Sequence, residues 1–166
     1  MKQGTISIIC GCHSQAHSLM VFLAWKKLYG TYPNYWQTGC IILHDIGHFG
    51  KNYLDNVEEK NNHWKLGAKI AMKLYGIKGY YEVAGHVGPK INALPESRMY
   101  KADKYSWYIT PYWILWWNNI IEPKIKHGMK NRDTIISFRQ WVKHNIESGE
   151  YRTTHDAYLE RIGELK

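Results

Sequence analysis

The chain places a histidine and an aspartate side by side at the end of an apolar run. Residues 40–43 are all apolar, and His44 and Asp45 follow them directly. Burying an ionised carboxylate is unfavourable unless the carboxylate is paired or binds a metal ion. Imidazole together with carboxylate suits iron, manganese, nickel or zinc better than calcium. The pair is therefore unusual for packing alone, and its two residues are candidate ligands of a divalent metal ion.

Other candidate ligands are spread along the chain, one on each of several expected helices. They are His17, His63, His86 and Asp103. Any one of these histidines alone would be more readily explained as an ordinary core or surface residue. Their succession, with the adjacent His-Asp pair and a later aspartate, is what indicates a metal site. His13 lies four residues before His17 on the same helix face, so it is an alternative ligand.

This order of residues resembles the HD-domain superfamily of metal-dependent phosphohydrolases. That family places a histidine on one helix, a His-Asp pair on the next and a lone aspartate on a later helix. The matching positions here are His17, the sequence His-Asp-Ile-Gly at 44–47, and Asp103. The residues after His17 follow the family's pattern, which favours His17 over His13. The resemblance covers roughly the first two-thirds of the chain.

Two further histidines resemble the two-metal subset of that family. His63 opens the pattern His-x-x-x-Gly-Ala, and His86 matches the later histidine of the subset. The resemblance implies one or two divalent ions, with Asp45 bridging a pair. It assigns one ion to His17, His44 and Asp103, and the other to His63 and His86.

The resemblance implies hydrolysis of a phosphomonoester or phosphodiester of a nucleotide or small organic phosphate. Such a reaction needs metal-bound water and groups that neutralise charge on the phosphate. The candidate catalytic residues are Asp45, His48 and Lys51; Arg98 and Lys104 are also near the motifs but are more readily explained as surface residues.

Two other functions remain open on the same residues. HD-type di-iron oxygenases use a similar set of six ligands, and a non-enzymatic module could bind an anionic ligand in the same pocket. The known specificities of the family do not fit cleanly. His48 stands where many cyclic-dinucleotide phosphodiesterases have lysine, Val87 follows His86 in place of a second histidine, and the acidic pair of alarmone hydrolases is absent.

The net charge indicates the kind of partner to expect, and the cysteine content indicates the cellular compartment. The formal net charge is +8 and the isoelectric point is about 9.3. A basic protein favours anionic partners, so we expect an anionic small-molecule substrate, with a nucleotide as first choice. An odd number of cysteines, three, predicts a reducing compartment and a cytoplasmic location.

Four tryptophans lie within residues 107–117. Thr110 and Pro111 interrupt this segment, and Asn118 and Asn119 follow it. A membrane-spanning helix needs roughly 20 mostly apolar residues, so no transmembrane segment is expected here. Trp116 and Trp117 are about 100° apart on a helix and rarely face one core. Because tryptophan and tyrosine are enriched in interfaces, we predict a homodimer contact through this segment.

Helical spacing of apolar residues dominates the chain. Val21 and Leu28 share a helix face with His17, and Gly30 is expected to end that helix. Leu66 and Leu74, together with His63 and Ile70, are expected to form the inward stripe of a helix that starts after Asn61 and Asn62. Other helices are expected at 35–46, at 80–87, from 95, from 133 and at 153–165, with a polar loop at 47–60.

These elements predict one domain. The 166 residues fit a single all-α, HD-domain-like bundle of about seven helices. We expect the motif-bearing part at residues 13–121 and the C-terminal helices at 133–166.

Overall fold

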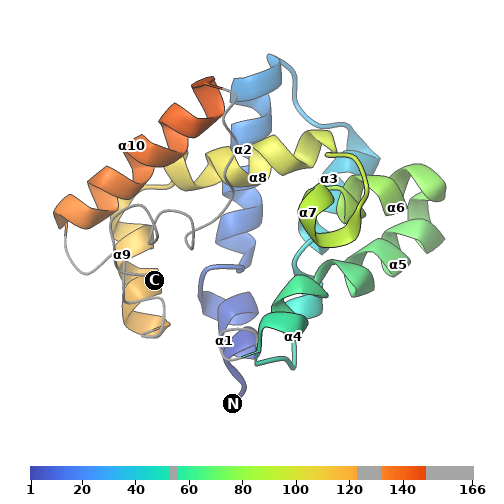
Figure 1. Ribbon diagram of the computed structural model, residues 1–166, viewed down its shortest axis with the longest axis horizontal. Coiled ribbons are helices and arrows are strands. Elements are labelled where there is room, and N and C mark those ends of the chain that lie inside the picture. Colours follow the sequence, from blue (N-terminus) through green and yellow to red (C-terminus); the bar gives the residue numbers. More distant parts are fainter. Residues whose placement is uncertain (53–55, 123–131, 149–166) are drawn as a thin grey trace.

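Every secondary-structure element in the computed structural model is helical, over the residues that it describes: 1–52, 56–122 and 132–148 (Figure 1). The predicted all-α fold is confirmed. The described ranges hold eight helices of seven or more residues, against about seven expected for the whole chain. The helix expected at 153–165 lies outside the described residues.

The helices are, in chain order, α1 (Gln3–Cys10), α2 (Gln15–Tyr29), α3 (Tyr35–Leu43), the 3-10 helix η1 (Ile46–His48), α4 (Val57–Asn61), α5 (Trp64–Tyr75), α6 (Ile77–Ala84), α7 (Pro89–Asn92), α8 (Arg98–Ile109), α9 (Tyr112–Ile121) and α10 (Arg132–Ser148). Two pairs pack most extensively. α2 crosses α8 in the centre of the molecule, and α5 forms a hairpin with α6 to one side (Figure 1). α9 and α10 lie on the opposite side.

Local signals explain several helix ends. α2 stops at Gly30, as predicted, because this glycine adopts the left-handed conformation with φ of 71°. Asn34 caps α3: its side chain accepts from the backbone N–H of Gln37, whose own side chain accepts from the backbone of Asn34. α3 ends at Leu43, three residues before the predicted end, so Asp45 lies in the turn before η1.

Other boundaries differ from the prediction. α1 was not expected, and α4 lies inside the predicted loop at 47–60. The helix predicted at 80–87 runs from Ile77 to Ala84, and the one expected from residue 95 begins at Arg98, after the short α7. These shifts leave the order of the ligand-bearing elements unchanged.

The predicted inward stripe of α5 is wrong at Leu66 and Leu74, although His63 at its start does face the interior. Its buried face is made of Trp64, Gly67, Ala68 and Ala71, whereas Leu66 and Leu74 are 47% and 61% exposed. A side chain at Gly67 would overlap the carbonyl oxygen of Leu43 at the end of α3. α5 therefore packs through its small residues, because only they allow this close backbone approach. The larger apolar side chains remain on the surface.

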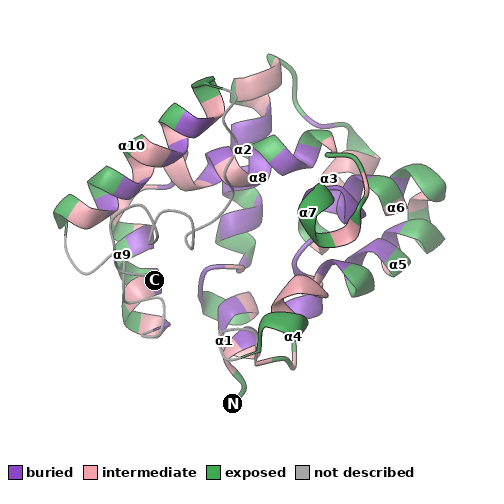
Figure 2. Ribbon diagram, viewed as in Figure 1, coloured by how far each residue is buried: buried purple, intermediate pink, exposed green. Residues whose placement is uncertain are grey.

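The described helices share two apolar clusters. The larger cluster includes Trp25, Ile41, Val83 and Met99, and it joins α2, α3, α6 and α8. Figure 2 shows the buried residues along α2 and α8 and the exposed outer faces of α5 and α6. A smaller cluster joins Leu115 of α9 to Ile135, Phe138 and Val142 of α10.

The tryptophan-rich segment is divided between two helices, because α8 ends at Ile109 and α9 starts after Pro111. Trp107 packs edge-on against Phe138 of α10, with ring centroids 6.0 Å apart. Trp113, Trp116 and Trp117 are 66%, 49% and 50% exposed. The homodimer contact through residues 107–117 stays a prediction.

No single helix in the described ranges is both long and apolar enough to cross a membrane. Within these ranges, only α1 and α2 taken together are long and apolar enough, and these two helices are bent at 57° to each other.

Candidate metal centre

The six predicted ligands come together in one cluster at the centre of the fold. Their elements are α2 for His17, the end of α3 for His44 and Asp45, the start of α5 for His63, the end of α6 for His86 and α8 for Asp103. All are buried except His63, whose side chain is 12% exposed. Polar side chains are rarely gathered in a core without a ligand or partners that compensate for their lost hydration.

One half of the cluster joins α2, α3 and α8. The Nε2 atom of His17 lies 3.0 Å from Oδ1 of Asp103 and 3.6 Å from Oδ2 of Asp45. The Nε2 atom of His44 lies 3.0 Å from the same Asp45 oxygen. His17, His44 and Asp45 offer ligand atoms that all lie within 4.8 Å of one another, so one ion could contact all three.

The other half joins the α5–α6 hairpin to the same aspartate. The second oxygen of Asp45, Oδ1, lies 3.5 Å from Nε2 of His63 and 3.8 Å from Nε2 of His86. Asp45 thus turns one oxygen toward each half. A carboxylate that bridges two metal ions has this arrangement.

Three of the histidines are held in a defined tautomer. The Nδ1 atoms of His44, His63 and His86 lie 2.6, 2.5 and 2.5 Å from the backbone carbonyl oxygens of residues 41, 60 and 83. A carbonyl oxygen can only accept, so each Nδ1 carries a proton and donates it. In His63 and His86, whose pKa values burial lowers, the neutral ring then presents a bare lone pair at Nε2. Histidines that bind metal ions are commonly oriented in this way.

The contact between His63 and His86 is the sharpest sign of a metal ion. Their Nε2 atoms lie 2.9 Å apart, and burial lowers the pKa of both rings, that of His86 well below its usual value. Both rings are therefore neutral near pH 7, and two lone pairs face each other. Two nitrogen ligands about 2.1 Å from one ion, at roughly 90°, would lie about 3 Å apart. The pair thus has the spacing of two ligands on a shared ion.

In the half that contains His17, His44 and Asp45, the pKa values favour a protonated His44 beside an ionised Asp45. Burial lowers the pKa of His44, but the Asp45 carboxylate outweighs this and raises the pKa to about 9. Burial likewise opposes ionisation of Asp45, yet His44 and other histidines hold its pKa well below the usual range. Nε2 of His44 and Oδ2 of Asp45 form an ion pair at 3.0 Å, but neither atom makes a hydrogen bond of regular geometry within the described residues. A metal ion would satisfy both atoms.

His13 and His48 form a third group with Asp45. Their ring centroids are 4.2 Å apart, and Nε2 of His48 lies 3.9 Å from Oδ1 of Asp45. His48 also stacks on His63 with centroids 4.3 Å apart. His13 therefore reaches the cluster beside His17 and not in its place. Burial lowers the pKa of His13 to about 3 and that of His48 well below its usual value, so both rings are neutral.

Of the candidate cationic side chains, only that of Lys104 contacts a predicted ligand among the described residues. Lys51 is half-exposed, and its Nζ lies 3.9 Å from the carboxylate of Glu59, away from the ligand contacts described above. Arg98 covers the ring of Tyr29, 4.7 Å from its centroid. Lys104 is the residue that sequence reasoning undervalued: its Nζ lies 2.7 Å from Oδ2 of Asp103. Its position directly after a ligand was the available signal.

The contact with Lys104 helps to explain why Asp103 is ionised. Burial opposes ionisation of this carboxyl group, but the Lys104 ammonium and His17 together hold its pKa well below the usual range. Asp103 is therefore a carboxylate near pH 7. Lys104 holds one oxygen, and the other faces His17.

A glycine sets the distance between Asp45 and His63. A side chain at Gly47, in η1, would overlap the backbone carbonyl of His63. The turn after Asp45 and the start of α5 can approach this closely only because Gly47 has no Cβ atom.

No family model, no curated protein and no solved structure matches the chain. The evidence for a metal site is therefore the buried cluster of histidines and aspartates itself, with its spacing and protonation. The predicted ligands His17, His44, Asp45, His63 and His86 all fall in groups able to hold an ion, and Asp103 contacts one of those groups.

We predict that His17 and His13 differ in their effect on metal binding. His17→Ala should weaken binding by more than about tenfold, because it removes a ligand that also contacts Asp103. His13→Ala should change the affinity by less than about threefold, because His13 belongs to neither the group of His17, His44 and Asp45 nor that of Asp45, His63 and His86. Its loss removes about one net hydrogen bond, to Ser7 at 2.7 Å. Titration of the metal-free protein with Co²⁺ would measure both, and the reverse order would make His13 the ligand.

Proposed function

We propose that this protein is an HD-type, two-metal phosphohydrolase that cleaves a phosphomonoester or phosphodiester of a nucleotide or small organic phosphate. The observation that carries the proposal is Asp45, whose two oxygens face two separate groups of ligands. The neutral Nε2 atoms of His63 and His86, 2.9 Å apart, support an ion on the second side. The donor set suits iron, manganese, nickel or zinc.

The residues around the cluster have distinct proposed tasks. Bound divalent ions would supply hydroxide near neutral pH and hold a phosphate oxygen. Lys104 orients Asp103, and its side chain is 20% exposed, so its ammonium group can also meet an anion that enters from solvent. His48 is a neutral ring beside Asp45 and can exchange a hydrogen bond with the substrate. Lys51 would first have to leave Glu59.

An anionic substrate agrees with the charge of the chain. The formal net charge is +8, and a basic surface raises the local concentration of anions. A nucleotide remains the first substrate class to test.

The test is phosphate release from a panel of nucleotides and simple phosphate esters, with protein loaded with manganese, iron or nickel. We expect release that requires the metal and stops on chelation. Lys104→Gln should lower the activity, because it removes the ammonium group beside Asp103. Lys101→Gln, at an exposed lysine on α8, is the matched control and should retain full activity. Oxygen consumption by the iron-loaded protein without phosphate release would replace the proposal with an oxygenase. Full metal content without turnover of any substrate would point to a binding module.

A further inference from the structure

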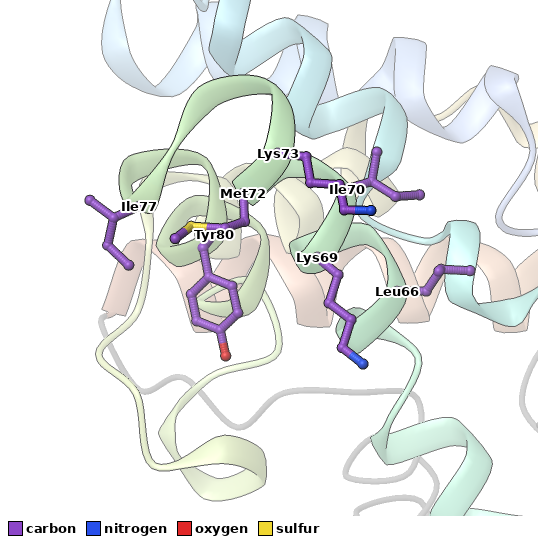
Figure 3. A pocket seen from close by; sticks show the side chains of 7 residues that line it. All are labelled: Leu66, Lys69, Ile70, Met72, Lys73, Ile77 and Tyr80. Atoms are coloured by element: carbon purple, nitrogen blue, oxygen red, sulfur yellow. The ribbon is translucent and has the colours of Figure 1, made fainter.

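The outer face of the α5–α6 hairpin exposes a row of large apolar side chains. Leu66, Met72, Leu74 and Ile77 are 47%, 43%, 61% and 55% exposed. Leu66, Met72 and Ile77 line an open groove of about 610 Å³, with Leu66 and Ile77 at its two ends, and Leu74 is exposed outside it (Figure 3). The row exists because α5 packs inward through its small residues. Contiguous apolar surface of this kind usually marks a site of interaction.

The same face is strongly basic. Residues 64–81 contain four lysines and no acidic residue. Lys69 and Lys73 line the groove with their aliphatic stems beside the apolar row (Figure 3), and Lys65 is exposed one turn before Lys69. Within the described ranges no ion pair is recorded for these three lysines. Their charge is available to a partner.

The composition distinguishes among possible partners. Apart from the lysines, the only polar side chains in residues 64–81 are one tryptophan and three tyrosines. Interfaces between proteins are depleted in lysine and enriched in arginine. A second copy of the chain would bring lysines against lysines, which repel. Lysines that extend beyond an apolar surface, with tyrosines among them, are typical of segments that lie at the surface of a lipid bilayer.

We propose that this basic and apolar face of α5–α6 docks on an anionic lipid bilayer. Leu74 and Ile77 enter the interfacial region of the lipid, and Lys65, Lys69 and Lys73 lie against the lipid phosphates. Each lysine near an anionic surface contributes about fivefold to binding at moderate salt. This docking does not depend on the metal centre or on its reaction.

The test is co-sedimentation of the full chain with vesicles of phosphatidylcholine alone, or with about 30% phosphatidylserine added. We expect binding to the anionic vesicles only, and weaker binding as salt is raised. Lys69→Gln with Lys73→Gln should lower the affinity about 25-fold. Leu74→Ser with Ile77→Ser should also lower it, which a purely electrostatic attraction would not produce.

A second lysine pair is the control for net charge. Lys90 and Lys101 are exposed on α7 and α8, and Lys90→Gln with Lys101→Gln lowers the formal charge from +8 to +6 (8 − 2), as the groove pair does. The control should bind like the wild type. Lys69, Lys73, Leu74 and Ile77 are all exposed, so circular dichroism should show an unchanged fold in these variants. Failure of the wild type to bind anionic vesicles, or equal losses in both lysine pairs, would overturn the proposal.

Discussion

Asp45→Asn should abolish metal binding at both halves of the centre and, with it, phosphohydrolase activity. Asparagine keeps the shape of the side chain but offers one oxygen and one N–H₂ group in place of two anionic oxygens. One half of the centre would then face the N–H₂ group, which cannot bind a metal ion. The other half would face an uncharged oxygen in place of an anionic one. We expect the affinity for each ion to fall by more than about 100-fold.

Elemental analysis of the purified variant is the direct measurement, with phosphate release as the second. Asp133→Asn is the matched control, because Asp133 is an exposed carboxylate in the first turn of α10. The control should retain the wild-type metal content. An Asp45→Asn protein that still holds two ions per chain would remove Asp45 from the centre.

Gly47→Ala should damage the centre without changing any ligand. The new methyl group would overlap the carbonyl of His63, so the start of α5 must move away from Asp45. Overpacking of this kind costs about 1–3 kcal/mol of folding free energy. For a domain of this size that is a fall in Tm of roughly 2–12 °C. We expect the ion on the His63 side to be lost and the ion at His17 and His44 to remain.

Gly50→Ala is the control for this substitution. Gly50 has a φ of 75° and no atom close to where a Cβ would lie. Its replacement costs only the unfavourable left-handed conformation, about 1–2 kcal/mol, and should leave the metal content intact. Thermal melts and metal analysis of both variants separate a steric effect from a conformational one. Two ions in Gly47→Ala would mean that this contact does not set the position of His63.

The cluster of candidate ligands could be predicted because the chemistry of these residues conflicts with their surroundings. His44 and Asp45 stand out at the end of an apolar run, and a buried carboxylate needs a partner. The end of α2 at Gly30 could be predicted because glycine adopts the left-handed conformation, and α3 starts at residue 35, as expected. These are local effects, which a sequence carries directly.

The remaining features depend on packing between distant segments. Leu66 and Leu74 looked like part of a core face, but both are exposed. The approach of α5 to α3 is set by Gly67, which lies against the backbone carbonyl of Leu43. A contact between two helices cannot be predicted from the sequence of one of them. The grouping of His13 and His48 beside Asp45 depends on how η1 turns after α3. Lys104 was undervalued because spacing does not show that its side chain turns back onto Asp103.

The ligands come from two separately packed pairs of helices. His17 and Asp103 belong to the α2–α8 pair, and His63 and His86 flank the α5–α6 hairpin, with His44 and Asp45 between them. Ions held by this set would act as a cross-link between the two pairs, worth about 2.7 kcal/mol at a metal concentration 100 times the Kd. A chain made without metal would lack that cross-link, so its hairpin would open more often and would be cut by proteases sooner. The lifetime of the protein in a cell would then follow the supply of metal.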